Sequence, residues 1–490
     1  MPRLSRLALL LTFLLALGIR LYDLTDPPFD FHSTRQFRSA VIARGMYYAR
    51  LPSASEPLRS LAIQQWHDEK QLEPPILEGL VSLTYFLPGG EALWKARLLS
   101  LCFWVAGGVA LYALLKKLLD SSAAWLGTLV YLFLPYGVFA SRSFQPDPLM
   151  VSLTIFAIWR IYEWHTARTW KNALLAGGLA GAAILIKAVA LFPIGCVALA
   201  LIGWDAGWKK SLRDGQTWAV GLLALAPGGL YYIYGLFIAG FLQGQAAQSF
   251  LPNLWLTTKY YLHWAGLGVQ VAGLGTLLLG GVGIFFWPTR SGRVLALGWG
   301  VGYLLYGFAF PYHIMTHDYY QLPLLPLVAF SITPLLAWGM SRLPARWGTL
   351  AFTLLAVVWV GFQMREAYAE LSRKSYVSDA QEWSRYQTLI PPDQNLLALV
   401  QAYGYPLKYY GWRTATLWAN TGDVALRELA GQSQFEEKRW EQFDGMDLFL
   451  VTNFNEFDRQ PELKEHLTTR FGVFAEGEGF VIYDLKAPLE

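Results

Sequence analysis

The sequence predicts a multi-spanning α-helical membrane protein with a small α/β domain at its C-terminal end. Hydrophobic residues make up 54% of the 490 residues and charged residues only 15%, whereas soluble globular proteins carry about 25% charged residues. The apolar residues form long stretches up to about residue 364, and charges become frequent only after Arg365. We therefore expect residues 1–364 to form a transmembrane domain with an outer loop at 23–95. Residues 365–490 are expected to form a separate domain on the outer face.

About eleven apolar stretches are long enough to cross the hydrocarbon core of a bilayer, which takes about 20 helical residues. The first follows a basic start, and we expect it to be retained as a span because no small-residue cleavage site follows it. The predicted spans are residues 4–22, 96–115, 122–141, 148–163, 172–186, 188–204, 217–241, 264–287, 294–312, 319–340 and 347–364.

The Lys and Arg residues between these stretches are distributed unevenly. If the N-terminus is cytoplasmic, the short outer loops hold only Lys187 and Lys259 besides Arg142. The inner segments then carry Arg3, Arg6, Lys116, Lys117, Arg160, Arg168, Lys171, Lys209, Lys210, Arg213, Arg290, Arg293, Arg342 and Arg346. This is the asymmetry of the positive-inside rule. We therefore expect a multi-pass protein of the cell inner (plasma) membrane, with the loop 23–95 and the C-terminal domain outside.

One further apolar segment runs from Pro74 to Pro88. Counting it as a span would invert every later loop and place the basic clusters outside, against the positive-inside rule. We therefore expect a helix that lies at the outer interface of the membrane.

The segment after Arg365 has the pattern of an α/β domain. Three short apolar runs are typical of buried strands, at 396–400, 447–451 and 479–483. Helical stretches at 379–389 and 423–430 stand between or beside them. Strands mixed with helices in this way predict a small sheet packed against helices.

The first outer loop carries Asp30, just after the first span. The residues that follow have helical spacing, with Ser33 or Thr34 as a possible cap and an apolar stripe on one face. We expect this helix to lie on the outer leaflet. Asp30 is then either an ordinary surface carboxylate or a reactive group held at the membrane surface.

The next outer loop carries Arg142 and Asp147. Asp147 precedes Pro148, which is typical of a helix N-cap followed by proline at the first helical position, and capping alone would explain it. A cap does not require the nearby Arg142. Ionisable groups at membrane depth cost about 2.5–3.5 kcal/mol and need a partner, so the two residues are also a candidate functional site.

Lys187 interrupts the otherwise uncharged run 172–204 at an expected outer turn. It either extends its ammonium group to the interface or binds an anionic lipid head group. The last outer loop carries His313, His317, Tyr319 and Tyr320. Two histidines without a third ligand are weak evidence for a metal, so we predict neither a metal nor a cofactor. An interfacial aromatic belt would explain the two tyrosines equally well.

Taken in order, these positions resemble the GT-C class of membrane glycosyltransferases, family 39. That family resembles both protein O-mannosyltransferases and the bacterial transferases that add aminoarabinose to lipid A. The resemblance rests on Asp30, Pro74-Pro75, Lys95–Ser100, Ser141-Arg142 with Pro146-Asp147, Ile186–Ala188, His317–Pro326 and the C-terminal domain. It covers the membrane part of the chain. Many relatives have Asp-Glu in the first loop where this chain has Asp30-Phe31, which leaves the position of any second acid open.

The resemblance implies transfer of a hexosyl or pentosyl unit from a polyprenyl-phosphate donor to an acceptor hydroxyl of a glycan, lipid or protein. A lipid phosphate is a good leaving group, so the reaction needs cations for its charge and a base for the acceptor proton, but no general acid. Asp30 suits the role of base. The full candidate site has Asp30 and Asp147 as catalytic residues, and Arg142, Lys187, His317, Tyr319 and Tyr320 as donor-binding residues.

Three other functions remain open at this point. A glycan ligase or polymerase would use the same lipid-linked donor and differ only in its acceptor. A lipid transporter or flippase would show charged or broken segments in matching halves of the chain, whereas these spans carry almost no charge. The protein could also be a non-enzymatic scaffold, and replacement of Asp30 by Asn would then leave its function unchanged.

The predicted topology can be tested with an impermeant thiol reagent. A cysteine placed at Asp393, in the C-terminal domain, should react in intact cells because the positive-inside rule places that domain outside. Protection of this cysteine in intact cells, with labelling only after lysis, would show the opposite orientation.

Overall fold

The computed structural model describes residues 2–429 and 439–489 and contains two compact units. The first, here called the membrane unit, comprises residues 1–25, 71–77 and 94–374. The second, here called the α/β unit, comprises residues 26–70, 78–93 and 375–490. The observed division differs from the expected one in the loop 23–95, because most of this loop belongs with the C-terminal segment.

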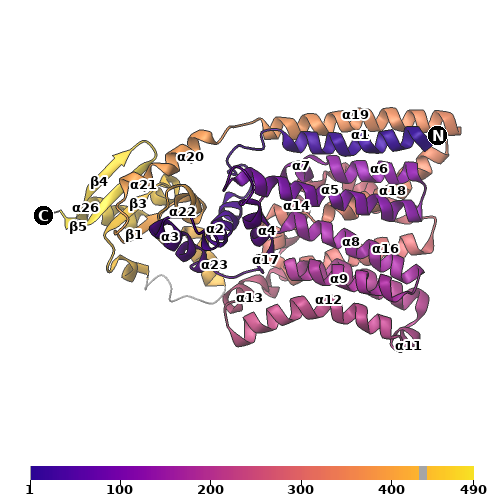
Figure 1. Cartoon of the computed structure of the whole chain (residues 1–490), viewed down its shortest axis with the longest axis horizontal. Coiled ribbons are helices and arrows are strands. Elements are labelled where there is room, and N and C mark those ends of the chain that lie inside the picture. Colours follow the sequence, from indigo (N-terminus) through magenta and orange to yellow (C-terminus); the bar gives the residue numbers. More distant parts are fainter. Residues whose placement is uncertain (1, 430–438, 490) are drawn as a thin grey trace. The chain divides into compact units, whose positions relative to one another are not determined.

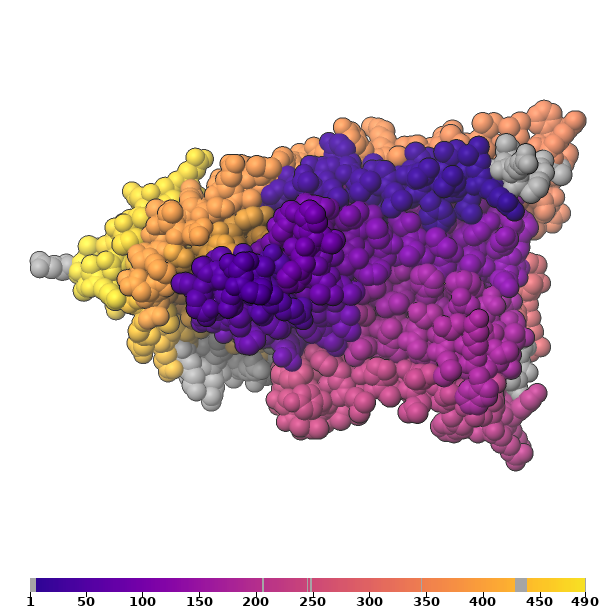
Figure 2. Space-filling view, in the orientation of Figure 1, coloured from indigo at the N-terminus to yellow at the C-terminus, as the bar shows by residue number. Residues whose placement is uncertain are grey.

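The membrane unit is a bundle of helices that run alongside one another (Figure 1). Its helices are α1 (Pro2–Leu21), α5 (Leu93–Leu118), α6 (Ser121–Phe133), α7 (Pro135–Ala140), α8 (Asp147–Thr166), α9 (Trp170–Ile186), η1 (Ala188–Ala190), α10 (Leu191–Leu201), η2 (Ile202–Ala206), α11 (Trp208–Ser211), α12 (Gly215–Ile233), η3 (Tyr234–Ile238), α13 (Gln243–Ser249), η4 (Pro252–Leu256), α14 (Thr258–Ala272), α15 (Leu274–Gly283), η5 (Ile284–Phe286), α16 (Arg290–Ala309), α17 (Pro311–Thr316), η6 (Asp318–Gln321), α18 (Leu324–Ser341) and α19 (Ala345–Leu371). Figure 2 shows α1 lying along α19 at the surface.

Each of the predicted spans coincides with one or more of these helices, but several are interrupted. Among the described residues, four helices are long and apolar enough to cross a membrane unbroken, or five if the pair α14 and α15 counts as one span. That pair bends by 94° at Gly273, whose positive φ of 79° suits glycine. The protein is a multi-pass membrane protein, and the number of eleven spans stays a prediction.

Small residues allow some of the helices to pack closely. At Gly181 in α9, a Cβ atom would come within 2.1 Å of the backbone oxygen of Leu223 in α12, and at Gly177 within 2.8 Å of the Leu223 side chain. Close approach of helix backbones at small residues is the usual way in which membrane helices associate.

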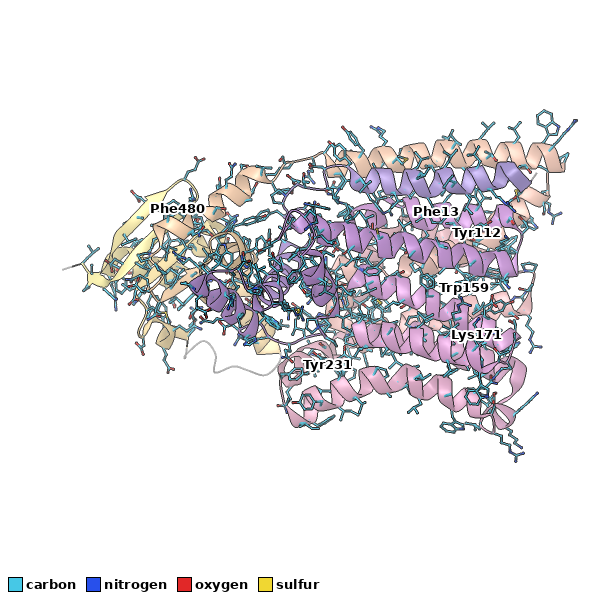
Figure 3. The ribbon with its side chains drawn as sticks, in the orientation of Figure 1. Phe13, Tyr112, Trp159, Lys171, Tyr231 and Phe480 are labelled. Atoms are coloured by element: carbon cyan, nitrogen blue, oxygen red, sulfur yellow. The ribbon has the colours of Figure 1, made fainter. Side chains whose placement is uncertain are left out.

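The basic residues between the helices gather at one end of the membrane unit. Lys117 at the end of α5 lies 3.3 Å from Glu163 near the end of α8. Arg168, between α8 and α9, lies 3.0 Å from Asp214, which precedes α12. Figure 3 shows Lys171 near this end of the bundle and Tyr231 near the other. The charge asymmetry seen in the sequence is therefore an asymmetry between the two ends of the bundle.

The α/β unit contains a five-stranded sheet with the order β2-β1-β3-β5-β4. Its strands are β1 (Leu396–Leu399), β2 (Thr416–Leu417), β3 (Leu448–Val451), β4 (Phe471–Gly477) and β5 (Phe480–Pro488). Strand β1 pairs in parallel with β2 and β3, whereas β5 is antiparallel to β3 and β4. Alternate residues of β1 enter the two cores that cover the faces of the sheet. The sheet confirms the predicted small C-terminal α/β domain, although β2 and β4 had no counterpart in the prediction.

The helices of the α/β unit come from both parts of the chain. They are α2 (Ser33–Ala49), α3 (Glu56–His67), most of α4 (Ile76–Thr84), α20 (Val377–Ser384), α21 (Tyr386–Leu389), η7 (Gln401–Gly404), α22 (Tyr405–Tyr410), α23 (Thr421–Leu429), η8 (Arg439–Phe443), α25 (Phe454–Asp458) and α26 (Pro461–Arg470). Helix α23 matches the stretch predicted at 423–430, whose last residue lies outside the described part of the chain. Helix α4 falls in the segment expected at the membrane interface, and that location stays a prediction.

The sequence interpretation of α2 was wrong. The helix is buried on all sides between residues 36 and 47, so it is not an amphipathic helix with an exposed polar face. It begins at Ser33 with His32 in the capping position, so neither Ser33 nor Thr34 is the cap. Its burial depends on contacts with α3 and α22, which a reading of local periodicity does not include.

Arg44 joins α2 to the C-terminal segment of the α/β unit. Its guanidinium donates hydrogen bonds to the backbone oxygens of Tyr409 (2.6 Å) and Lys408 (2.8 Å) and to Oε1 of Gln65 (2.6 Å). It also lies 3.7 Å from the ring centre of Trp412. Burial lowers the pKa of Arg44 and raises that of the nearby Glu91 carboxyl, while the attraction between the two opposes both changes.

Candidate functional site

The centre of the candidate site is an ion pair between Asp147 and Lys187. Helices α8 and α9 are joined by the short connection 167–169 and pack against each other, so the start of α8 lies beside the end of α9. Lys187 Nζ donates to Asp147 Oδ1 at 2.8 Å. The side chains are only 5% and 2% exposed, so water screens this pair little. Two of the predicted site residues are thus brought together.

The expectation that Asp147 caps α8 was wrong. Asp147 is the first residue of the helix, the capping position is Pro146, and no side-chain cap bond is present there. The carboxylate binds Lys187 instead. Its second oxygen, Oδ2, has no hydrogen-bond partner among the described residues. A buried carboxylate oxygen without a donor is costly, which favours a functional role for Asp147.

Lys187 stands at a break in the helical backbone. It follows the last residue of α9 with extended geometry (φ −159°, ψ 123°), and its ammonium group points into the protein. The interpretation of Lys187 as a surface lysine was therefore wrong, since the residue is 4% exposed. The ring centres of Tyr320 and Tyr319 lie 4.3 and 5.2 Å from Nζ, within the range of a cation–π interaction.

The two tyrosines belong to an ordered turn. Tyr319 and Tyr320 are 4% and 7% exposed, so an exposed aromatic belt does not account for them. The Tyr306 hydroxyl donates to the backbone oxygen of Tyr320 at 3.0 Å, and the ring of His313 stacks on Tyr320 at 4.9 Å. The ring of His317 lies 5.5 Å from Tyr319 and 6.0 Å from Tyr320. Among the described residues, no three His, Cys, Asp or Glu side chains are placed to hold a metal.

A cavity of about 200 Å³ opens beside Lys187 and Tyr320. Its lining residues are Leu72, Glu73, Lys187, Ala188, Val189, Tyr232, Leu236, Leu242, Ala246, Ser249, Phe310 and Tyr320. The Tyr232 hydroxyl accepts a hydrogen bond from the backbone N–H of Ala188 (3.2 Å). The cavity is therefore mostly apolar, with Glu73 and Lys187 as the charged groups of its lining.

Arg142 binds the end of α1, and Asp30 belongs to the α/β unit. The two terminal nitrogens of Arg142 donate to the backbone oxygens of Tyr22 (2.7 Å) and Asp23 (2.9 Å), where the chain leaves α1. Arg142 is not among the residues that line the cavity. Asp30 belongs to the α/β unit, and its side chain is exposed. The structure thus groups Asp147, Lys187, His317, Tyr319 and Tyr320.

Sequence reasoning missed three polar residues of the cavity, Glu73, Tyr232 and Ser249. Glu73 had a signal, because it directly precedes the Pro74-Pro75 pair, and a residue before proline is restricted to extended backbone. Tyr232 is one of many tyrosines in apolar stretches and had no distinguishing signal. Buried Arg20 was also missed. It donates to Ser141 Oγ and to the backbone oxygen of Leu132, both at 2.8 Å, and so holds α1 against the segment that leads to α8.

Comparison with known proteins supports the resemblance found in the sequence. The dolichyl-phosphate-mannose-protein mannosyltransferase family matches residues 73–232, which include Arg142, Asp147 and Lys187. No curated protein matches the chain.

Solved structures show the same fold. ArnT from Cupriavidus metallidurans bound to undecaprenyl phosphate has a TM-score of 0.62 at 17% identity, and the similarity covers 97% of each chain. Its apo structure has a TM-score of 0.60. The oligosaccharyltransferase of Archaeoglobus fulgidus, in complex with Zn and sulfate, has a TM-score of 0.56 at 11% identity, covering 99% of this chain and 74% of the other. The chain therefore has the fold of GT-C membrane glycosyltransferases, and the predicted resemblance to this class is confirmed.

The buried ion pair predicts a non-additive effect on stability. Lys187→Met should lower the free energy of unfolding by about 3–5 kcal/mol, because Asp147 becomes an unpaired buried charge. Asp147→Asn in the same protein should restore much of this loss, since no charge then remains unpaired. The thermal unfolding midpoints of the two single variants and the double variant in detergent measure the coupling.

Lys117→Met is a suitable control, because the Lys117 side chain is 59% exposed in its pair with Glu163 and should contribute at most about 1 kcal/mol. Additive effects of the Lys187 and Asp147 replacements would contradict the assigned coupling.

Proposed function

We propose that this chain is an integral membrane glycosyltransferase. It moves a hexosyl or pentosyl unit from a polyprenyl-phosphate donor to an acceptor hydroxyl at the outer face of the plasma membrane. The observation that carries this proposal is the Lys187–Asp147 pair beside a cavity at one end of a GT-C bundle. The basic interhelical segments gather at the other end, which is the cytoplasmic side in this proposal.

The relatives support the class of donor. ArnT from Cupriavidus metallidurans binds undecaprenyl phosphate, a lipid with the phosphate that remains after a lipid-linked sugar is transferred. The archaeal oligosaccharyltransferase has been observed tethered to an acceptor peptide with the sequence NVT. The acceptor of the present chain is a hydroxyl compound, of the glycan, lipid or protein class.

Lys187 is the cation for the leaving phosphate in this mechanism. As the bond between sugar and phosphate breaks, negative charge grows on the phosphate, and a fixed ammonium group in an apolar cavity stabilises it more than water would. Asp147 holds Lys187 at the break after α9, and Tyr320 flanks the ammonium group. Lys187 is thus positioned before the donor arrives, so little reorganisation accompanies the reaction.

The other proposed donor contacts are less direct. His317 and Tyr319 surround Tyr320 and fix its ring, so they act on the donor through the aromatic cluster. The hydrogen bonds of Arg142 support a role at the end of α1, and a contact of Arg142 with the donor stays a prediction.

Asp30 is the proposed base. A base must reach the acceptor hydroxyl, and the exposed Asp30 side chain is accessible to an acceptor from solution. The Asp147 carboxylate is buried and paired with Lys187, which favours a role in positioning that lysine. The proton of the acceptor hydroxyl then passes to Asp30 as the acceptor oxygen attacks the anomeric carbon and the lipid phosphate leaves.

Incubation of the purified protein with a panel of polyprenyl-phosphate sugars tests the function. We expect release of polyprenyl phosphate with at least one member when cell-envelope glycans, lipids or proteins are added as acceptors. Soluble nucleotide sugars should not replace the lipid-linked donor. Turnover of a nucleotide sugar alone, or no release from any lipid-linked donor, would refute the proposal.

Replacement of Asp30 by Asn tests the base. Asn has nearly the same shape but cannot accept the proton, so single-turnover transfer should fall by about 10²- to 10⁴-fold while donor binding is retained. Asp147→Asn is the comparison, and it should impair donor binding because Lys187 loses its partner. Normal transfer by Asp30→Asn together with an inactive Asp147→Asn protein that still binds donor would reverse the two roles.

A further inference from the structure

The cavity of the membrane unit has a second charged group that the proposed mechanism does not use. Glu73 and Lys187 are the charged residues that line it. The ammonium group of Lys187 already has a carboxylate partner, Asp147, at 2.8 Å. Glu73 is therefore not required to balance the charge of Lys187. Glu73 is half-buried in the lining of a mostly apolar cavity, and ionisable side chains at such places in membrane proteins mark candidate functional sites.

The backbone holds Glu73 in place before any substrate arrives. The residue precedes two consecutive prolines, which restrict it to extended geometry, and α4 begins directly after them at Ile76. Its carboxylate interacts electrostatically with the Tyr232 hydroxyl, and this hydroxyl accepts a hydrogen bond from the N–H of Ala188, next to Lys187. Glu73 and Lys187 therefore lie at the same part of the cavity wall, on either side of Tyr232 and Ala188 in this chain of contacts.

The chemistry of the two groups is complementary to the two ends of a sugar phosphate. A phosphate oxygen in a diester carries negative charge and has no proton to donate, so it is attracted by Lys187 and repelled by Glu73. Sugar hydroxyls donate hydrogen bonds, which an ionised carboxylate accepts strongly. The cavity of about 200 Å³ is smaller than the roughly 300–1,000 Å³ of pockets for drug-sized ligands, so it suits the sugar-phosphate head group and not the polyprenyl chain.

We propose that Glu73 is the sugar-binding carboxylate of this cavity. It accepts hydrogen bonds from hydroxyls of the transferred sugar and, with Lys187 on the phosphate, fixes the direction in which the lipid-linked donor lies. This inference rests on the proposed function and adds to it the residue that recognises the sugar. It also places a second acid of the site directly before Pro74, whereas Asp30 is the only acid among residues 29–45.

Equilibrium binding of two lipids tests the proposal. The probes are undecaprenyl phosphate, which has no sugar, and the polyprenyl-phosphate sugar that the wild-type protein uses. Glu73→Gln and Glu73→Ala should weaken binding of the sugar-bearing lipid by about 10- to 100-fold, with the larger effect for Ala. Binding of the sugar-free lipid should be unchanged or tighter, because a negative charge near the phosphate is removed.

Glu163→Gln is the matched control, since this carboxylate lies at the other end of the bundle, where it pairs with Lys117. Both lipids should bind this variant as they bind the wild type. Equal weakening of both lipids by the Glu73 variants would indicate a structural role and overturn the proposal. Unchanged binding of both, with or without slower transfer, would overturn it as well. Failure of the wild-type protein to bind either lipid would instead refute the proposed function itself.

Discussion

The arrangement of the site depends on the neutralisation of one buried positive charge. Lys187 interrupts an apolar stretch, and an ammonium group there is tolerated only with a partner. The antiparallel pairing of α8 and α9 supplies Asp147 at 2.8 Å, and Tyr319 and Tyr320 face the same ammonium group. These residues come from three places in the fold, which are the start of α8, the end of α9 and the turn η6. The pair therefore fixes the ends of α8 and α9 and the turn before α18 relative to one another, and the cavity lies where they meet.

In the α/β unit a buried cation, Arg44, likewise has partners for its charge, but there it stabilises the fold. Arg44 is buried in α2 and satisfies the backbone oxygens of Lys408 and Tyr409 in α22. Glu69, a buried carboxylate just after α3, lies 3.7 Å from Arg38 and also binds Lys408. A long loop and a distant C-terminal segment thus form one unit through contacts separated by more than three hundred residues. Such contacts carry no local signal, which explains why the sequence suggested a division at residue 364.

Composition and periodicity predicted the membrane class, the positions of the apolar helices and three strands of the sheet. These features depend on local patterns, and Leu396–Leu399 is an example of a fully buried strand with a continuous apolar run. The edge strand β4 is largely exposed and has no such pattern, so it was missed. Among the site residues, Asp147 and Lys187 were identified because charge is rare in apolar segments. Their pairing, the burial of Tyr320 and the presence of Glu73 in the cavity depend on tertiary contacts that spacing along the chain does not encode.

Several interruptions of the helices lie at the cavity, although the bend at Gly273 does not. At membrane depth, backbone that leaves the regular helix is tolerated where it lines a cavity or is buried in protein. The extended residue Lys187 separates α9 from η1, the π-helical segment η3 contains Leu236, and Phe310 separates α16 from α17. All three residues line the cavity, as does Tyr320 in the 3₁₀ turn η6. Hydropathy identifies the apolar stretches but not these breaks, because an interrupted helix has the same composition as a continuous one. The breaks are therefore the feature that turns an apolar bundle into a site with charged groups inside it.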